Sequence, residues 1–344
     1  MTHPWQWQYP PLACHSHGWL EVGDGHAIHW EECGNPLGLP ALFLHGGPGA
    51  GCTAQDRRWF DPSRYRIVLF DQRGCGRSRP LGRLEANTAD ALLADIETLR
   101  RHLRIDRWLL FGGSWGATLA LAYAERLPER VHALVLRGVY AATAGERRWL
   151  YAPGGVAQLQ PQDWQCFVDP IPPHARGNLL AAYQQQLDSD DPRIRATATR
   201  AWLAWELSLM AHESPGCPAA ISPDPPDAAA HAMARIGVHY ARHAGLLARG
   251  SLWSNAGRLA GVPGVIVQGG LDRVTPPATA LALHRAWPGS RLQWVARGGH
   301  ASSHPEIARA LVEATDAFAL PGGAAPVSNH DHKETTHGRG DTMR

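Results

Sequence analysis

Lysine is nearly absent from this chain, because Lys333 is the only lysine among its 344 residues. That residue lies in a C-terminal stretch rich in glycine and polar side chains. A lysine Schiff base and a phosphate-binding P-loop lysine are therefore both excluded from the folded core. The chain must use other groups for any chemistry it performs.

A surplus of either charge is missing as well. Lys and Arg number 33 against 31 for Asp and Glu, so the formal net charge is only +2 at pH 7. So small an excess offers no electrostatic case for a nucleic-acid partner or a membrane surface. Hydrophobic residues make up 44% of the chain, and no apolar run approaches the roughly 18 residues of a spanning helix. We expect a globular protein with neither kind of partner.

Paired cysteines are also lacking, since the six cysteines are scattered and no C-x-x-C motif occurs. They are Cys14, Cys33, Cys52, Cys75, Cys166 and Cys217. This pattern is typical of reduced cytosolic thiols rather than of a disulfide framework or a zinc site. Residues 1–5 show no basic segment leading into an apolar stretch, so we expect no secretory signal and a cytoplasmic location.

The most informative feature that is present is the sequence Gly-Gly-Ser-Trp-Gly at residues 112–116. It follows the apolar run 108–111 and precedes the apolar run 117–123, which predicts a buried strand, a G-x-S-x-G turn and a helix. Such a nucleophile elbow strains the serine backbone, and glycines flank it because side chains there would collide. The helix N-terminus beneath the serine favours developing negative charge. Ser114 is therefore the candidate nucleophile.

An acid and a base are expected later in the chain, in the order Ser, then Asp or Glu, then His. Residues 264–268 predict a buried strand, and Asp272 follows it on a Gly-Gly-Leu-Asp loop. Residues 292–295 predict a last short strand, and His300 follows it before a helix. His300 would take the serine proton and return it to the leaving amine, while Asp272 would hold the imidazole tautomer. Ser114, Asp272 and His300 thus form a candidate triad.

The tetrahedral intermediate of acyl transfer also needs N–H donors for its oxyanion. Residues 42–44 predict a strand that ends in His-Gly-Gly-Pro-Gly at residues 45–49, an HGG-type turn. We assign the oxyanion hole to the backbone N–H groups of Gly47 and Trp115. Loss of one such donor typically raises the barrier by about 3–4 kcal/mol.

Strands and helices alternate along most of the chain. The turn Gly-Asp-Gly at residues 23–25 predicts a hairpin between strands at 19–22 and 26–30. Thr88 is expected to cap a helix whose apolar residues recur at helical spacing. The alternation predicts an α/β fold with a mostly parallel central sheet, helices on both faces and active loops at the carboxyl ends of the strands.

Strand alternation stops between about residues 141 and 259, where largely helical stretches replace it. We expect an α/β core formed by residues 1–140 and 260–320, with residues 141–259 inserted as a helical cap over the catalytic edge. Residues 321–344 contain almost no large apolar side chains. We expect this tail to be disordered.

Four longer motifs carry a family resemblance. They are residues 45–52 (His-Gly-Gly-Pro-Gly-Ala-Gly-Cys), 71–78 (Asp-Gln-Arg-Gly-Cys-Gly-Arg-Ser), 112–121, and 136–138 (Leu-Arg-Gly). On these motifs the chain resembles the proline iminopeptidases, serine aminopeptidases of the α/β-hydrolase fold. The similarity runs from about Tyr9 to Leu320 and is densest before Tyr140. It implies release of N-terminal proline from small peptides, without metal or organic cofactor, by the triad named above.

An aminopeptidase must also recognise a free cationic amine, which a buried carboxylate does selectively. Glu206 lies inside the aromatic and aliphatic run Trp-Leu-Ala-Trp-Glu-Leu. The resemblance implies that Glu206 grips the substrate amine and that Arg137 pairs with this acid. Three aromatic residues are candidates either for a wall around the flat pyrrolidine ring or for packing between cap and core: Tyr140, Trp149 and Tyr151.

The chain departs from the family pattern at two positions that bear on the substrate. Gly237 stands where the family usually has a second amine-binding glutamate, and Thr275 stands where some members have a cysteine in the proline pocket. The strictness of the proline preference is therefore left open. A broader amidase, esterase or general aminopeptidase remains an alternative, and so does a binding-only relative, which a complete triad argues against.

Overall fold

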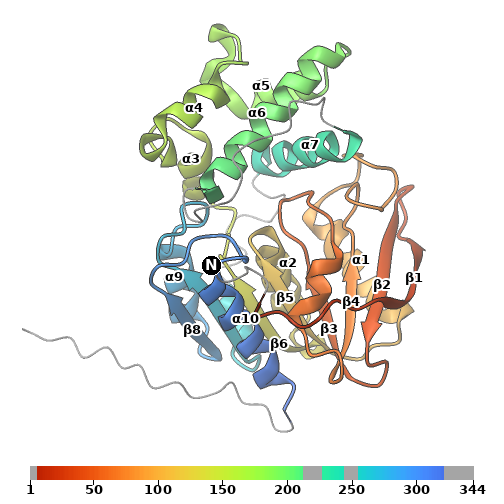
Figure 1. Cartoon of the computed structure of the whole chain (residues 1–344). Helices are drawn as coiled ribbons and strands as arrows, with labels where there is room; N and C mark the ends of the chain where they lie inside the picture. The colour runs from red at the N-terminus through yellow and green to blue at the C-terminus, as the bar shows by residue number, and fades with distance from the viewer. Residues whose placement is uncertain (1–5, 212–226, 244–254, 321–344) are drawn as a thin grey trace, which may run out of the picture.

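The computed structural model describes residues 6–211, 227–243 and 255–320 (Figure 1). They contain one eight-stranded sheet in the order β1-β2-β4-β3-β5-β6-β7-β8. Its strands are β1 Cys14–Glu21, β2 Ala27–Gly34, β3 Leu39–Leu44, β4 Tyr65–Phe70, β5 Trp108–Gly113, β6 Val131–Arg137, β7 Gly264–Gly269 and β8 Ser290–Val295. Strand β2 pairs antiparallel with β1 and β4, and all other neighbours are parallel. The mostly parallel sheet expected from the sequence is confirmed.

Strands β1 and β2 form the predicted hairpin, with both strands longer than expected. The N–H of Val22 donates to the carbonyl of His26 at 3.0 Å, closing the turn. Gly23 and Gly25 adopt positive φ angles of 84° and 70°. Glycine takes this left-handed conformation without steric penalty, which explains why the turn carries two glycines.

The burial of each strand follows its place in the sheet. Every residue of the central strands β5 and β7 is buried, as expected where helices cover both faces. Edge strand β1 instead alternates half-buried and exposed residues along its length. The continuous apolar runs in the sequence therefore mark the interior of the sheet, whose carboxyl ends carry the site.

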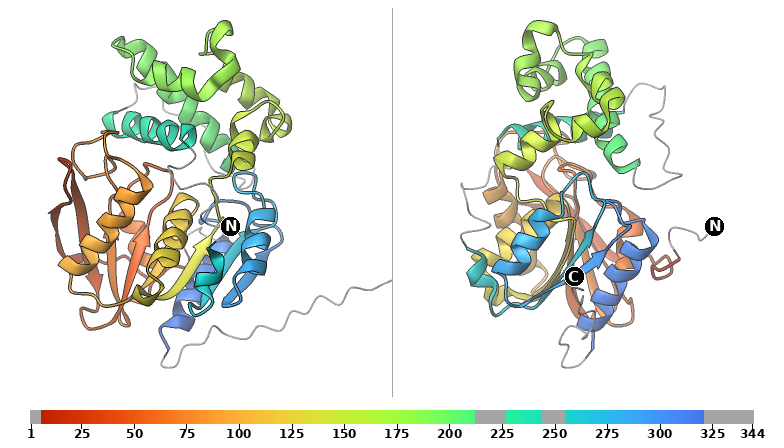
Figure 2. Two further views of the ribbon diagram at one scale, coloured as in Figure 1. Left: turned by 180° about the vertical axis from the view of Figure 1, so that it is seen from behind. Right: turned by 90° about the vertical axis from the view of Figure 1, so that its left-hand side faces the viewer.

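Helices cover both faces of the sheet (Figure 2). One core cluster joins one face to α1 Ala89–His102, α2 Trp115–Arg126 and α9 Ala278–Ala286. A second cluster joins the opposite face to the 3₁₀ helix η1 Ala54–Trp59 and to α10 Pro305–Phe318. The cap predicted at Thr88 is confirmed, because its side chain accepts a hydrogen bond from the N–H of Ala91 at 3.2 Å. Short 3₁₀ turns at Pro128–Arg130 and Ala256–Leu259 complete this layer.

Among the described residues, five α-helices lie beyond the carboxyl edge of the sheet (Figures 1 and 2). They are α3 Ala144–Tyr151, α4 Pro161–Val168, α5 Leu179–Leu187, α6 Pro192–Ala211 and α7 Ala228–Arg242, with 3₁₀ helices η3 Val156–Leu159 and η4 Pro173–Asn178. These helices have a core of their own, in which the rings of Phe167 and Tyr183 stack at 4.6 Å. The inserted helical cap of the fold class is thus present. The boundaries proposed for it, residues 141–259, stay a prediction.

Helix α7 fastens the cap to the sheet layer. The hydroxyl of Tyr240 donates to Oδ1 of Asn87 at 2.7 Å, and its ring packs on Trp115 at 4.6 Å between centroids. Because Trp115 begins α2 directly after Ser114, this contact holds the cap beside the elbow. In the part of the chain that the structure describes, no helix combines the length and apolarity needed to cross a bilayer. The tail expected to be disordered, residues 321–344, lies outside the described residues.

Candidate active site

Ser114 occupies a sharp turn between β5 and α2. Its φ of 56° and ψ of −121° lie in a region that L-residues avoid, at a cost of about 1–3 kcal/mol. A β-carbon at Gly112 would collide with the carbonyl oxygen of Gly116, and one at Gly116 would collide with that of Leu44. Both glycines are therefore required for this close strand-to-helix approach, as expected for an elbow.

The two segments expected to supply the oxyanion hole are tied together by Gln72. Its side-chain amide donates to the carbonyl of His45 at 2.9 Å, and its Oε1 accepts from the indole N–H of Trp115 at 3.0 Å. Gly47, in the turn after His45, has a φ of 110°, and a β-carbon there would lie 2.7 Å from the N of Gly49. Gln72 lies in the motif at residues 71–78, but nothing in that motif indicates this role.

Asp272 and His300 meet directly. Nδ1 of His300 lies 2.9 Å from Oδ2 of Asp272, and both residues are buried. The other carboxylate oxygen, Oδ1, accepts the backbone N–H groups of Val274 at 2.9 Å and Thr275 at 2.8 Å. The Thr275 hydroxyl adds a fourth contact, donating to Oδ2 at 2.8 Å. Thr275 therefore orients the carboxylate that orients His300, a role the sequence had not indicated.

The ionisation of this pair suits proton transfer. Burial alone would raise the pKa of Asp272, but the charge and hydrogen bond of His300, with the hydrogen bonds from Thr275, hold it below its ordinary value. Burial lowers the pKa of His300, and the nearby Arg137 guanidinium lowers it further, against the opposing pull of Asp272. At neutral pH His300 is therefore neutral and able to accept a proton, beside an ionised Asp272.

One cavity of about 500 Å³ brings the candidate residues together between the sheet edge and the cap. From the sheet side it is lined by Gly47, Ser114, Trp115, Arg137 and His300. From the cap side it is lined by Tyr140, Tyr151, Glu206 and Gly237. Segments spread over more than half of the chain thus line one cavity of the size that small ligands occupy.

Glu206 faces this cavity rather than bulk solvent. Burial raises its pKa to about 7, against hydrogen bonding from Tyr151 that stabilises the charged form. The Tyr151 hydroxyl lies 3.3 Å from Oε1. A carboxyl group poised in this way becomes a full counter-charge once a cation enters the cavity.

Arg137 contacts the histidine loop, while the pairing with Glu206 that the resemblance implies stays a prediction. Its Nη1 donates to the backbone carbonyl of His300, whereas Glu206 accepts from Tyr151. Arg137 ends strand β6, next to the elbow, where the carbonyl of Arg137 also accepts the N–H of Ser114 at 2.9 Å. The strand end therefore directs Arg137 to the histidine loop. Because Arg137 also lines the cavity, its side chain is in a position to contact the substrate.

Of the three aromatic candidates, two line the cavity and one does not. Tyr140 and Tyr151 line the cavity, but Trp149 lies outside its lining. The indole N–H of Trp149 donates to the carbonyl of Arg273 at 2.7 Å, which fastens α3 to the loop after β7. Because Trp149 and Tyr151 are two positions apart on a helix, they point in different directions, and only one can face the cavity.

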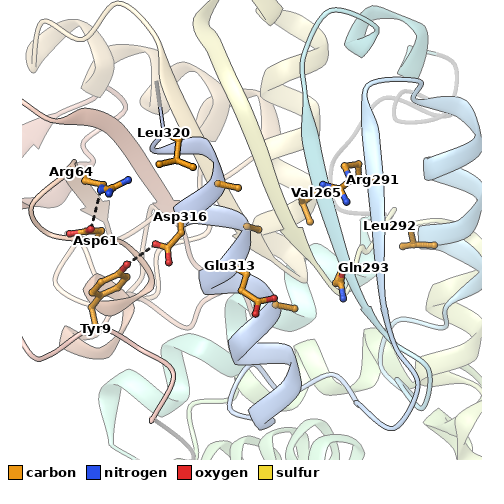
Figure 3. Close-up of a pocket in the computed structure, with 13 residues that line it drawn as sticks. Tyr9, Asp61, Arg64, Val265, Arg291, Leu292, Gln293, Glu313, Asp316 and Leu320 are labelled. Carbon is orange, nitrogen blue, oxygen red and sulfur yellow. Dashed lines mark hydrogen bonds and ion pairs between the residues drawn. The ribbon is translucent and has the colours of Figure 1, made fainter. Parts of the chain in front are cut away.

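A larger cavity of about 700 Å³ lies away from this site, between α10, β7 and β8 (Figure 3). Three of its charged residues have partners, since the hydroxyl of Tyr9 donates to Asp316 at 2.7 Å and Arg64 pairs with Asp61 at 3.4 Å. No serine, cysteine or histidine is among its lining residues. The candidate nucleophile Ser114 lines the cavity of about 500 Å³ instead.

Comparison with known proteins defines the class first. The family model for the alpha/beta hydrolase fold matches residues 40–306, so the chain belongs to the α/β hydrolases. An α/β hydrolase from a deep-sea metagenome library has a TM-score of 0.58 at 15% identity, covering 91% of this chain and 100% of that one. An esterase from Rhodococcus sp. has a TM-score of 0.57 at 19% identity, covering 88% and 98%. These structures share the fold.

Sequence relatives narrow the class. The proline iminopeptidase of Xanthomonas citri is 44% identical over 319 residues, covering 90% of this chain and 99% of its own. That of Neisseria gonorrhoeae is 44% identical and covers 87% and 94%, and that of Arabidopsis thaliana is 44% identical and covers 90% and 81%. The chain therefore belongs to the proline iminopeptidase family.

Proposed function

We propose that this protein is a serine aminopeptidase that releases N-terminal proline from small peptides through a prolyl-enzyme ester. The observation that carries the proposal is one cavity lined by Ser114, His300 and the half-buried acid Glu206. An aminopeptidase needs a nucleophile with a neighbouring base, and an acid that pairs with the cationic amine of the substrate. This cavity brings candidates for all three together. Relatives that are 44% identical and named proline iminopeptidases support the same function.

Acylation begins when Oγ of Ser114 attacks the prolyl carbonyl while its proton passes to Nε2 of His300. The carbonyl oxygen becomes an oxyanion that the N–H groups of Gly47 and Trp115 stabilise. The resulting imidazolium is stabilised by Asp272 and gives its proton to the departing amine. The C–N bond breaks, and proline is left as an ester on Ser114.

Deacylation repeats these steps with water. His300 takes a proton from water, the hydroxide attacks the ester carbonyl, and the same N–H groups hold the oxyanion. Collapse breaks the bond to Oγ, which regains its proton from His300. Free proline leaves, and no metal ion or organic cofactor takes part in the proposed cycle.

Glu206 supplies the recognition of the substrate amine. In its ionised form it pairs with the cationic secondary amine of proline, and low solvent access makes this pair selective. Tyr140 and Tyr151 supply flat surfaces beside the ring, and Arg137 completes the lining near His300. Peptides that begin with proline are thus the proposed partners.

A cytoplasmic location is part of the proposal. The five cysteines that the structure describes are all free thiols, as expected in a reducing compartment. Cell fractionation followed by an assay with a prolyl arylamide measures this directly. Recovery of the activity outside the cytosolic fraction would contradict the location.

A panel of prolyl, alanyl and leucyl arylamides with short acyl esters tests the function. Prolyl cleavage should exceed alanyl and leucyl cleavage in kcat/KM. Ester turnover without prolyl cleavage would replace the proposal by a broader hydrolase, an alternative favoured by the absence of a second acid at Gly237. Labelling of Ser114 by a fluorophosphonate probe is expected, and folded protein that resists the probe would indicate a binding-only relative.

A further inference from the structure

A third cavity, of about 270 Å³, adjoins the cavity of about 500 Å³ that Ser114 lines. The two cavities share Gly46, Ala50, Arg137 and Ser302 in their linings. This volume is below that of typical small-molecule pockets, so it suits one amino-acid side chain rather than a whole peptide.

The shared residues lie on the histidine side of the active site. Ser302 is two positions after His300, and Nη1 of Arg137 donates to the carbonyl of His300. Glu206 and Tyr151, at the amine-binding end, line the cavity around Ser114 but not the cavity of about 270 Å³. The smaller cavity therefore opens off the end of the active site opposite to the substrate amine.

In the proposed reaction, the leaving group lies at the His300 end of the active site. His300 must deliver a proton to the departing nitrogen, so that nitrogen lies beside the imidazole. The peptide beyond it must continue past the residues next to His300. Among the described residues, Ser302 and Arg137 occupy that place and lead from one cavity into the other.

We propose that the smaller cavity is the subsite for the residue that follows the N-terminal proline. This inference rests on the proposed function, whose substrate orientation it uses. Phe43, Phe111, Trp59 and Leu311 form an apolar floor, with Phe43 and Trp59 stacked on Phe111 at 5.6 and 5.7 Å. The subsite therefore favours a large apolar side chain at the second position of the peptide.

Asp56 and the exposed Thr53 also line this subsite. Oδ2 of Asp56 accepts from the backbone N–H and the hydroxyl of Thr53, at 2.7 and 2.8 Å. A second carboxylate placed here would meet the charge of Asp56 in a partly buried setting. The subsite therefore disfavours an acidic residue at the second position.

Three amides that differ only in the leaving group test the inference: prolinamide, Pro-Gly-NH₂ and Pro-Leu-NH₂. Wild-type kcat/KM for Pro-Leu-NH₂ should exceed that for Pro-Gly-NH₂ by at least about tenfold, since even one methylene in an apolar pocket is worth roughly 10-fold or more. Pro-Asp-NH₂ should fall below Pro-Leu-NH₂ by a similar factor. Equal values for leucine and glycine would overturn the subsite without any variant.

A substitution that fills the cavity provides a second test of the subsite. Thr53→Trp should lower kcat/KM for Pro-Leu-NH₂ by about tenfold or more, while prolinamide, whose leaving group is ammonia, changes by less than about twofold. Thr53→Ala removes the same hydroxyl but leaves the cavity open, so it should preserve the preference for leucine. Equal losses on both substrates with Thr53→Trp would overturn the subsite. Wild-type enzyme that cleaves none of the amides would overturn the proposed function itself, and the subsite with it.

Discussion

The indole nitrogen of Trp202 lies 3.0 Å from the point that a β-carbon on residue 237 would occupy. Trp202 is fully buried, and its ring stacks on Tyr151 at 5.0 Å, with 18° between the planes. Tyr151 in turn donates to Glu206. The glycine at position 237, where the family usually has glutamate, is thus matched to a tryptophan that supports the proposed amine-binding residue.

Gly237→Ala should destabilise the protein despite its place in helix α7. Alanine gains about 1 kcal/mol over glycine in a helix interior, but overpacking in a filled core costs about 1–3 kcal/mol. Because the ring of Trp202 also lies against those of Phe167 and Tyr183, we expect overpacking to outweigh the gain and the free energy of unfolding to fall by up to about 2 kcal/mol. Urea denaturation measures the change. A variant more stable than wild type would mean that the ring moves freely.

Glu206→Gln should weaken prolyl turnover and spare a neutral ester. The amide keeps the shape of the side chain but loses the counter-charge for the amine. We expect kcat/KM for a prolyl arylamide to fall by about 10- to 100-fold, which corresponds to the roughly 1.5–3 kcal/mol of a charge-assisted hydrogen bond. A short acyl ester is the control substrate, because it carries no cation. Equal loss on both substrates would contradict amine recognition.

The pH dependence should differ between the two substrate classes. Glu206, whose pKa is about 7, must ionise to bind the cation, so kcat/KM for prolyl substrates should rise with an apparent pKa near 7. For neutral esters, kcat/KM should depend on the lowered pKa of His300 instead, so its rise should occur at a more acidic pH. Tyr151→Phe keeps the stacking on Trp202 but removes a hydrogen bond to the carboxylate, so the prolyl limb should move to higher pH. An unchanged prolyl limb would show that Tyr151 does not tune Glu206.

Ser114→Ala should lower prolyl turnover by several orders of magnitude while preserving the fold. Ser114→Gly should be equally inactive but more stable than the alanine variant by about 1 kcal/mol, since glycine tolerates the φ of 56°. Thermal unfolding of both variants measures the difference. Identical melting temperatures would argue against backbone strain at the elbow, and retained activity would point to another nucleophile.

Glu125 should make the protein less stable at alkaline pH. It is buried on α2, burial raises its pKa to about 8 against the charge of Arg258, and its Oε1 has no hydrogen-bond partner among the described residues. The folded state therefore holds a proton that the unfolded state loses near the ordinary value of 4.5. The stabilising contribution is complete below that value and is lost as the pH rises through 8.

Glu125→Gln removes this titration. Its free energy of unfolding should change less between pH 5 and pH 9 than that of wild type, by a margin on the order of 4 kcal/mol, since about three pKa units separate pH 5 from the folded-state pKa of about 8 and each corresponds to about 1.4 kcal/mol. Chemical denaturation at both pH values gives the comparison. A parallel loss in both proteins would assign the alkaline sensitivity to another group.

Much of the fold was open to prediction because its signals are local. The apolar runs that became β5 and β7 are wholly buried, and Gly-Asp-Gly made the expected turn. The place of Ser114 between a strand and a helix followed from the same kind of pattern. Its catalytic role, like those of Asp272 and His300, stays a proposal that the labelling and kinetic experiments address.

Other features of the site could not be read from spacing. Gln72 joins His45 to Trp115, Arg137 turns to the histidine loop, and Trp149 points away from the cavity. Each depends on which side chains meet after distant elements pack. A motif can name such a residue, but it contains no information about the partner across the interface.

The amino-acid sequence by itself determined the order of strands and helices, the strained serine turn and the positions of an acid and a histidine after later strands. These follow from hydrophobic periodicity and from the steric needs of glycine, which act over a few neighbouring residues. Only the tertiary structure decided that Glu206 has a pKa near 7, that Thr275 holds Asp272, and that a side cavity opens beside His300. Burial and hydrogen bonding between remote segments arise only when the chain has packed, so they are properties of the fold rather than of any local stretch.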